Sequence, residues 1–254
     1  MRVGLFDPET RIERDLHEHE ADVPDLIRLE SVQDAVEHRS DLEYVVAVGE
    51  PALLSVFRTA MNAPLIPVAV DAGLPSVSED QLDTALESLA NGDVESVEMP
   101  TIDVSLGESE FRALMDVMAV TAEPARISEF RTKKGDGTVV DTVRADGVVV
   151  SAPAGTPGYG TAVDGPILDP AVGGVAVVPV GQFRTAHPRW VLAPPVEIEV
   201  VRDTVPISLV VDDHEVETMP ADTSLRLTWG RPVEFGVLEH SKRSLGEKRS
   251  TLTR

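Results

Sequence analysis

A loop of small residues at positions 151–158 is the part of this sequence best suited to approach a ligand closely. It has the sequence Ser-Ala-Pro-Ala-Gly-Thr-Pro-Gly and follows an apolar run, Val148–Val150, that is typical of a buried strand. Glycine and alanine add little bulk to the backbone, so a ligand could reach the main chain here. Tyr159 is the one aromatic residue that follows, and its ring offers a face for stacking. The alternative is a tight surface connection with a structural tyrosine, which composition alone favours.

Two other segments have the composition of a site but the wrong context. Residues 135–138, Gly-Asp-Gly-Thr, could form a phosphate loop, but Asp-Gly between two β-prone runs predicts a hairpin turn. His17 and His19 flank Glu18 on an acidic segment and lack the helical spacing that two metal ligands need. There is no cysteine, so disulfides and thiolate metal sites are excluded. The sequence therefore predicts no metal site.

The composition indicates a strongly acidic globular protein. The net charge is −22, from 44 Asp and Glu against 22 Lys and Arg in 254 residues. This charge argues against nucleic acid and anionic membranes as partners, because phosphate groups need a basic surface. Four residues are lysine, and an acid-rich, lysine-poor chain is typical of a halophile. No apolar run has the length of a membrane span and no signal peptide is evident, so we expect a soluble, cytoplasmic protein.

Strand and helix patterns alternate over the first ninety residues. The predicted strands cover 1–6, 44–48 and 65–70, and the predicted helical segments cover 26–36, 52–57 and 78–89. This alternation predicts a parallel sheet with helices on its faces. Ligands of such sheets bind at the carboxyl ends of the strands, and the turn at Gly49 is such a place.

The pattern changes at about residue 94. Runs rich in Val, Ile and Thr follow at short spacing, among them a run over 110–121, and they predict an all-β region. The expected fold class is therefore α/β followed by β. A Rossmann-like α/β domain covers 1–95, an all-β, sandwich-like domain covers 96–229, and a polar tail covers 241–254.

Residues 146–166 resemble the signature of the NAD kinase family. That family has a pattern close to D-G-hydrophobic-hydrophobic-V-S-T-P-T-G-S-T-A-Y, followed about six residues later by G-P. The positions that match without a gap are Asp146, Gly147, Ser151, Pro153, Gly155, Tyr159, Gly165 and Pro166. The strands at 2–6 and 65–70 and the helix at 78–89 also fall where the family has them, so the resemblance extends over nearly the whole chain.

The resemblance implies an activity and a set of binding residues. Members of the family use ATP, or polyphosphate in some cases, to phosphorylate the adenosine 2′-hydroxyl of NAD, assisted by a divalent metal, usually Mg²⁺. The residues implied to bind the dinucleotide are Asp116, Asp146, Ser151, Gly155, Thr156 and Tyr159. Of these, Tyr159 and its loop would contact the adenosine part, and Asp146 would lie near the nicotinamide end. The family also implies a homodimer or homotetramer, and final strands at about 230–240 that return to the first domain.

The segment implied to hold the phosphate donor departs from the family pattern. The family has Gly-Gly-Asp-Gly-Thr after a strand, with backbone N–H groups on the phosphates and the Asp as base. Here the implied donor loop has Gly49, Glu50 and Ala52, with Glu50 in the place of the catalytic Asp. Pro51 removes one backbone N–H, and a reactive group displaced by about 1 Å can cost on the order of a hundredfold in rate.

Further departures affect the remaining family positions. Met115-Asp116 replaces an Asn-Glu pair, Asp71 stands where an Asn is expected, and Asp212-Asp213-His214 replaces Asp-Gly-Gln. The match over 181–189 is too loose to assign a role to Phe183 or His187.

Three hypotheses about function remain open from the sequence. The first is a divergent NAD kinase with Glu50 as base. The second is a catalytically inactive relative that binds NAD(H) or NADP(H) as a sensor or as the regulatory subunit of an active kinase. The third is an enzyme with another acceptor or donor on the same fold, since a fold does not determine function where the site has changed.

Overall fold

The computed structural model describes residues 1–12, 25–123, 126–202, 205–220 and 222–241. The segment with His17 and His19, and the expected tail from residue 242 onward, lie outside these residues. Two compact units are present: one consists of Met1–Met99 and the chain from Val233 onward, the other of Pro100–Pro232. Each unit is described by itself below.

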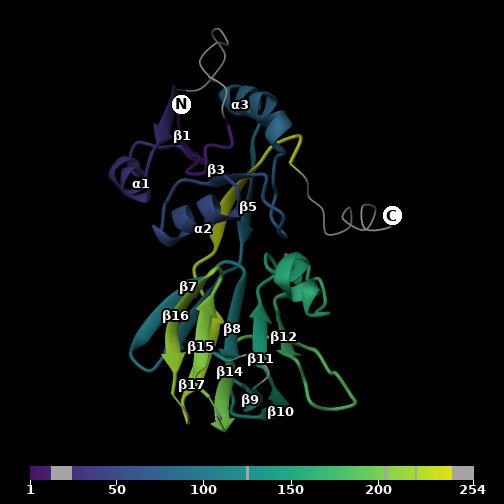
Figure 1. Cartoon of the computed structure of the whole chain (residues 1–254). Helices are drawn as coiled ribbons and strands as arrows, with labels where there is room; N and C mark the ends of the chain where they lie inside the picture. Colours follow the sequence, from purple (N-terminus) through teal and green to yellow (C-terminus); the bar gives the residue numbers. More distant parts are fainter. Residues whose placement is uncertain (13–24, 124–125, 203–204, 221, 242–254) are drawn as a thin grey trace. The chain divides into compact units, whose positions relative to one another are not determined.

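The first unit contains a six-stranded sheet in the order β2-β1-β3-β4-β18-β5. Figure 1 labels β1, β3 and β5 of this sheet. Its strands are β1 (Arg2–Phe6), β2 (Asp25–Leu29), β3 (Tyr44–Val48), β4 (Leu65–Val68), β5 (Glu95–Met99) and β18 (Val233–Val237). Neighbouring strands are parallel except β18 and β5, which are antiparallel. The helical elements are α1 (Val32–His38), α2 (Glu50–Arg58), η1 (Glu79–Gln81) and α3 (Leu82–Ala90). The predicted α/β architecture of this region is confirmed.

The helical segment predicted over 26–36 is wrong for its first half. Residues 25–29 form β2, which pairs in parallel with β1, and α1 begins only after Ser31. The Ser31 hydroxyl accepts the Asp34 N–H at 3.1 Å, and the Asp34 carboxylate accepts the Ser31 N–H at 3.0 Å. This capping box sets the start of the helix, while hydrogen bonds to β1 make the preceding residues a strand.

The second unit consists of two six-stranded antiparallel sheets, with orders β10-β9-β14-β17-β6-β7 and β13-β12-β11-β8-β15-β16. The strands of the first are β6 (Ile102–Leu106), β7 (Ser109–Ala113), β9 (Ser128–Lys134), β10 (Val139–Ala145), β14 (Val196–Arg202) and β17 (Ser224–Trp229). Those of the second are β8 (Asp116–Thr121), β11 (Gly147–Ser151), β12 (Val175–Val180), β13 (Trp190–Leu192), β15 (Ile207–Val211) and β16 (His214–Met219). Phe130 and Ile198 of one sheet share a hydrophobic core with Val148, Val177 and Leu209 of the other. The predicted β architecture is confirmed.

Two local predictions in this unit have opposite outcomes. The hairpin turn at 135–138 is confirmed, with Gly137 at φ +82° and β9 and β10 on either side. The continuous run over 110–121 is instead divided into β7 and β8, which belong to different sheets. The chain passes between the sheets at Leu114 and Met115, whose side chains are buried. We call residues 113–116 the corner.

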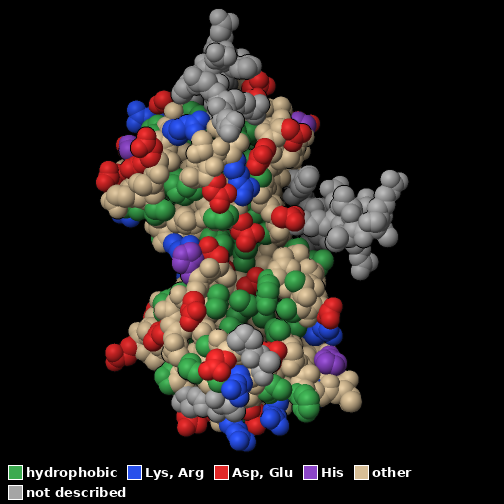
Figure 2. Space-filling model, viewed as in Figure 1, with side chains coloured by type: hydrophobic (Ala, Val, Ile, Leu, Met, Phe, Trp, Pro, Cys, Tyr) green, Lys and Arg blue, Asp and Glu red, His purple; other side chains and the backbone are tan. Residues whose placement is uncertain are grey.

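Opposite charges face one another across the outer side of the sheet that contains β9, β14 and β17. Glu199 of β14 lies 3.2 Å from Arg131 and 2.5 Å from Lys133 of β9, and Arg226 of β17 lies 2.6 Å from Glu197. Figure 2 shows acidic side chains on the surface of both units. Each of these cross-strand pairs joins a cation to a carboxylate on a neighbouring strand, which favours the observed register.

We expect Glu199→Gln to lower the free energy of unfolding only at pH values above those at which this carboxylate titrates. The hydrogen bond from Lys133 is the main cause that lowers the pKa of Glu199 from its ordinary value of 4.5. A lowered folded-state pKa stabilises the fold above pH 4.5, and this contribution is lost as the pH falls through the folded value. Thermal unfolding between pH 3 and pH 7 at low salt should show a difference of at most about 1 kcal/mol that disappears at the acid end. A difference that does not change with pH would contradict this assignment.

Candidate functional site

The loop after β11 is anchored to the corner by backbone contacts. Ser151, the last residue of β11, pairs with Asp116, the first residue of β8. The next residue, Ala152, donates its N–H to the Met115 carbonyl at 2.8 Å. The chain then forms an irregular helical turn, η2 (Thr156–Gly160), that brings Tyr159 to the surface. We call residues 151–160 the nucleotide loop, in view of the expected ligand.

Gly155 is the point where the nucleotide loop crosses the corner most closely. A Cβ atom at this position would lie 2.5 Å from the Met115 carbonyl oxygen and 2.7 Å from Oδ1 of Asp116. Real Cβ atoms do not approach backbone this closely, so a residue with a side chain would displace the loop. The glycine that the sequence singled out is therefore required by packing against Asp116.

The predicted residues Asp116, Ser151 and Gly155 are brought together, and the first two are buried. Among the described residues, the Ser151 hydroxyl has no hydrogen-bond partner. An unsatisfied buried hydroxyl is costly, so it marks a place where a further polar atom would be stabilised. Thr156 is also buried, but its hydroxyl donates to the Pro153 carbonyl at 2.9 Å and accepts the Leu168 N–H at 3.0 Å. Its side chain therefore holds the loop in shape.

The two remaining predicted residues of this unit are Tyr159, in the nucleotide loop, and Asp146, before β11. Tyr159 is 45% exposed, so part of its ring is accessible. Asp146 precedes the first residue of β11, whereas Ser151 ends it. Five residues of strand span roughly 16 Å, so Asp146 lies at the opposite end of β11 from the nucleotide loop. There it packs against Gly181, where a Cβ would lie 2.2 Å from its Oδ2.

In the first unit, the predicted donor loop forms the start of α2. Gly49 has φ +86° and donates its N–H to the Val68 carbonyl at 2.8 Å. Glu50 is the first residue of α2 and is exposed, whereas Ala52 is 1% exposed and packs within the unit. Pro51 lies in the first turn of the helix. The N–H of Gly49 is therefore already used at this turn, and Pro51 has none to offer an anion.

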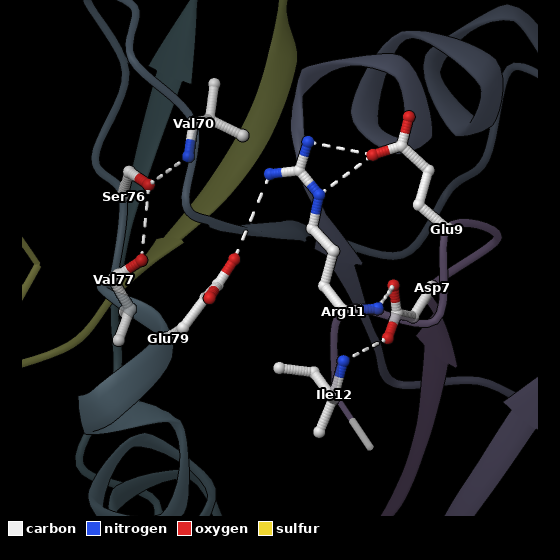
Figure 3. Close-up of polar contacts among 8 residues, drawn as sticks. All are labelled: Asp7, Glu9, Arg11, Ile12, Val70, Ser76, Val77 and Glu79. Carbon is white, nitrogen blue, oxygen red and sulfur yellow. Dashed lines mark hydrogen bonds and ion pairs between the residues drawn. The ribbon is translucent and has the colours of Figure 1, made fainter.

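Arg11 is a residue of this region that sequence reasoning missed. Its guanidinium lies beside Gly49, 3.1 Å from where a Cβ of that residue would be. Figure 3 shows the side chain between two carboxylates, at 2.8 Å from Glu9 and 3.9 Å from Glu79. The Asp7 carboxylate holds this segment by accepting the N–H groups of Arg11 at 3.0 Å and Ile12 at 2.8 Å. In the sequence, Asp7-Pro8 indicates only the end of a strand, so the position of Arg11 beside Gly49 could not be predicted.

A pocket of about 510 Å³ lies in the first unit beyond β4. It is lined by Ala69, Val70, Asp71, Ala72, Leu74, Ser76, Val77, Ser78, Glu79 and Asp80. Ser76 shapes its wall, since its hydroxyl accepts the Val70 N–H at 3.0 Å (Figure 3). Its lining is acidic and has no aromatic side chain, so a ligand here would be held by polar contacts and aliphatic packing.

Within the described ranges, no group of three or more His, Asp or Glu side chains is arranged to hold a metal ion. In the same part of the chain, no helix is both long and apolar enough to cross a membrane.

Comparison with known families gives a match over most of the second unit. Residues 114–233 match the model of the ATP-NAD kinase C-terminal domain. This range begins in the corner and includes the nucleotide loop.

Comparison with individual proteins extends the similarity to both units. The chain is 30% identical over 206 residues to an NAD kinase of Methanosarcina acetivorans, covering 79% of this chain and 71% of that relative. The structure of an Archaeoglobus fulgidus NAD kinase in complex with ATP is similar with a TM-score of 0.73 at 20% identity, over 96% of this chain and 95% of that one. Yeast NADH kinase complexed with NADH gives the same TM-score at 14% identity, over 93% and 83%. At these identities the two structures show a shared fold.

Proposed function

Because the chain belongs to the NAD kinase family, we propose that it binds NAD(H) or NADP(H) and phosphorylates the adenosine 2′-hydroxyl of NAD to form NADP. ATP or polyphosphate would be the donor. The observation that carries the proposal is the close packing of Gly155 against the Met115 carbonyl and the Asp116 carboxylate. Gly155 lies against the corner at this point, and Tyr159 of the same loop is 45% exposed.

Glu50 is the residue to which we assign the role of general base. Phosphoryl transfer requires a group that orients the attacking hydroxyl and accepts its proton. Glu50 carries an exposed carboxylate at the carboxyl end of β3, where ligands of parallel sheets bind. The guanidinium of Arg11 lies beside Gly49 at the same turn, where it also pairs with Glu9 and Glu79. When Mg²⁺ enters with the donor, it would neutralise phosphate charge.

The direct test is NADP formation by the purified protein. It would be incubated at high salt with NAD, Mg²⁺ and either ATP or polyphosphate, and NADP would be measured with an NADP-specific dehydrogenase. Turnover with either donor supports the proposal, and the preferred donor is read from the same experiment. Binding of NAD or NADP by calorimetry, without turnover, would reject the catalytic part alone.

The geometry at Gly49 favours one second candidate, a dinucleotide-binding sensor or regulatory subunit without activity. The Gly49 N–H is bonded to Val68 and Pro51 has no N–H. A donor phosphate would thus meet fewer backbone donors than a glycine-rich turn provides. This candidate predicts tight dinucleotide binding with no NADP formed, and size-exclusion chromatography with light scattering would show whether the chain is the dimer or tetramer we propose.

We expect Gly155→Ala to weaken dinucleotide binding by at least about tenfold, or about 1.4 kcal/mol. The new methyl group would meet the Met115 carbonyl at 2.5 Å, and overpacking of this kind typically costs about 1–3 kcal/mol. Titration with NADH, followed by its fluorescence, measures the change. Val172→Ala is the control, because this side chain is 56% exposed in the same unit. Equal losses of NADH affinity in both variants would contradict the assigned packing of Gly155 against the corner.

A further inference from the structure

The carboxylate of Asp212 holds the corner by accepting three backbone N–H groups. Its Oδ2 accepts from Leu114 at 3.0 Å, and its Oδ1 accepts from Met115 at 2.7 Å and from Asp116 at 3.1 Å. The Asp212 N–H in turn donates to the Asp116 carbonyl at 2.8 Å. One residue therefore satisfies successive backbone donors of a segment about a hundred positions away in the sequence.

These N–H groups need a partner because the chain crosses from one sheet to the other within the corner, at Leu114 and Met115. β7 ends at Ala113 and β8 begins at Asp116, so the backbone between them leaves one ladder before it joins the other. Buried backbone N–H groups without a partner are costly. Asp212 is placed to meet them by the two-residue turn between β15 and β16, where it adopts φ +53°. Asp and Asn are the side-chain-bearing residues that tolerate this conformation best.

The corner is also the segment against which the nucleotide loop packs. The Met115 carbonyl accepts the Ala152 N–H at 2.8 Å, and the backbone of Met115 and the carboxylate of Asp116 form the seat of Gly155. The peptide units that Asp212 fixes through their N–H groups are therefore those that the nucleotide loop contacts. A shift of the corner would move both the hydrogen bond at Ala152 and the surface under Gly155.

We propose that Asp212 is a positioning residue for dinucleotide binding, acting through the corner on the nucleotide loop. This inference rests on the proposed function for the identity of the ligand. The ordering of the loop by Asp212 is a property of the protein alone. Family membership explains an aspartate at the end of this strand, but its bonds to Leu114, Met115 and Asp116 are what assign its role.

Asp212→Asn tests the proposal with little change in shape. Asparagine keeps one acceptor oxygen, so either Leu114 or both Met115 and Asp116 lose their partner, and it still tolerates a positive φ. We expect the Kd for NADH to rise about tenfold, which corresponds to about 1.4 kcal/mol. Where turnover occurs, the KM for NAD should rise with kcat unchanged. Amide hydrogen exchange without ligand should accelerate over 114–116 and also over 152–160.

Asp213→Asn is the matched control, since it removes the same charge one residue further along the same turn. Its carboxylate pairs with His214 at 2.9 Å, so affinity and exchange in the nucleotide loop should stay at wild-type values. Asp212→Asn with wild-type NADH affinity, or with faster exchange confined to 114–116, would overturn the proposal. If wild-type protein binds no dinucleotide, the proposed function fails. The exchange of residues 152–160 then still decides whether Asp212 orders the loop.

Discussion

Glu50→Gln is expected to lower the rate of NADP formation by at least about a hundredfold while leaving NADH affinity unchanged. General bases contribute typically about 10²- to 10⁴-fold to a rate, and the amide has nearly the shape of the carboxylate but cannot take the proton. Glu50 is exposed at the first residue of α2, so the substitution does not disturb a core. Initial rates at saturating NAD and donor, with a parallel NADH titration, measure both quantities.

Glu37→Gln is the control, because Glu37 is an exposed glutamate on α1 of the same unit. It should retain the wild-type rate. A Glu50→Gln protein with wild-type turnover would show that another group accepts the proton. Wild-type protein that binds NADH but forms no NADP would favour the regulatory candidate, in which Glu50 carries no chemistry.

Phe235→Ala is expected to destabilise the first unit by about 3–5 kcal/mol, the usual cost of removing a fully buried phenylalanine ring. Phe235 is 0% exposed in β18, between β4 and β5. The chain supplies a selective measurement, since both tryptophans, Trp190 and Trp229, lie in the second unit. Guanidinium unfolding followed by tryptophan fluorescence reports that unit, and far-ultraviolet circular dichroism reports both.

The expected result is an early circular-dichroism transition in the variant that tryptophan fluorescence does not follow. Phe183→Ala makes the same change of side chain at a position that is 73% exposed, and its stability should stay within about 0.5 kcal/mol of wild type. If the two variants are equally stable, β18 does not contribute to the core of the first unit as its burial indicates.

The sequence predicted elements well where local interactions decide the structure. The apolar run Tyr44–Val48 forms the strand that its continuous apolar pattern predicts, and Asp136-Gly137 forms a turn because its own residues favour one. Predictions failed where a distant partner decides. Residues 25–29 have helical spacing but pair with β1, and the run over 110–121 divides because each half finds a different sheet.

The sequence by itself determined the family, the two kinds of fold along the chain and the importance of Gly155, because spacing and residue type survive in a linear motif. Only the tertiary structure showed why Gly155 has to be a glycine. It also showed that the Gly49 N–H is hydrogen-bonded to the Val68 carbonyl and that the Arg11 guanidinium lies beside Gly49. It also decided the role of Asp212, whose partner Met115 is 97 positions away. A hydrogen bond between residues so far apart in the sequence forms only because two strands end close together in space. No local pattern of residues predicts that proximity.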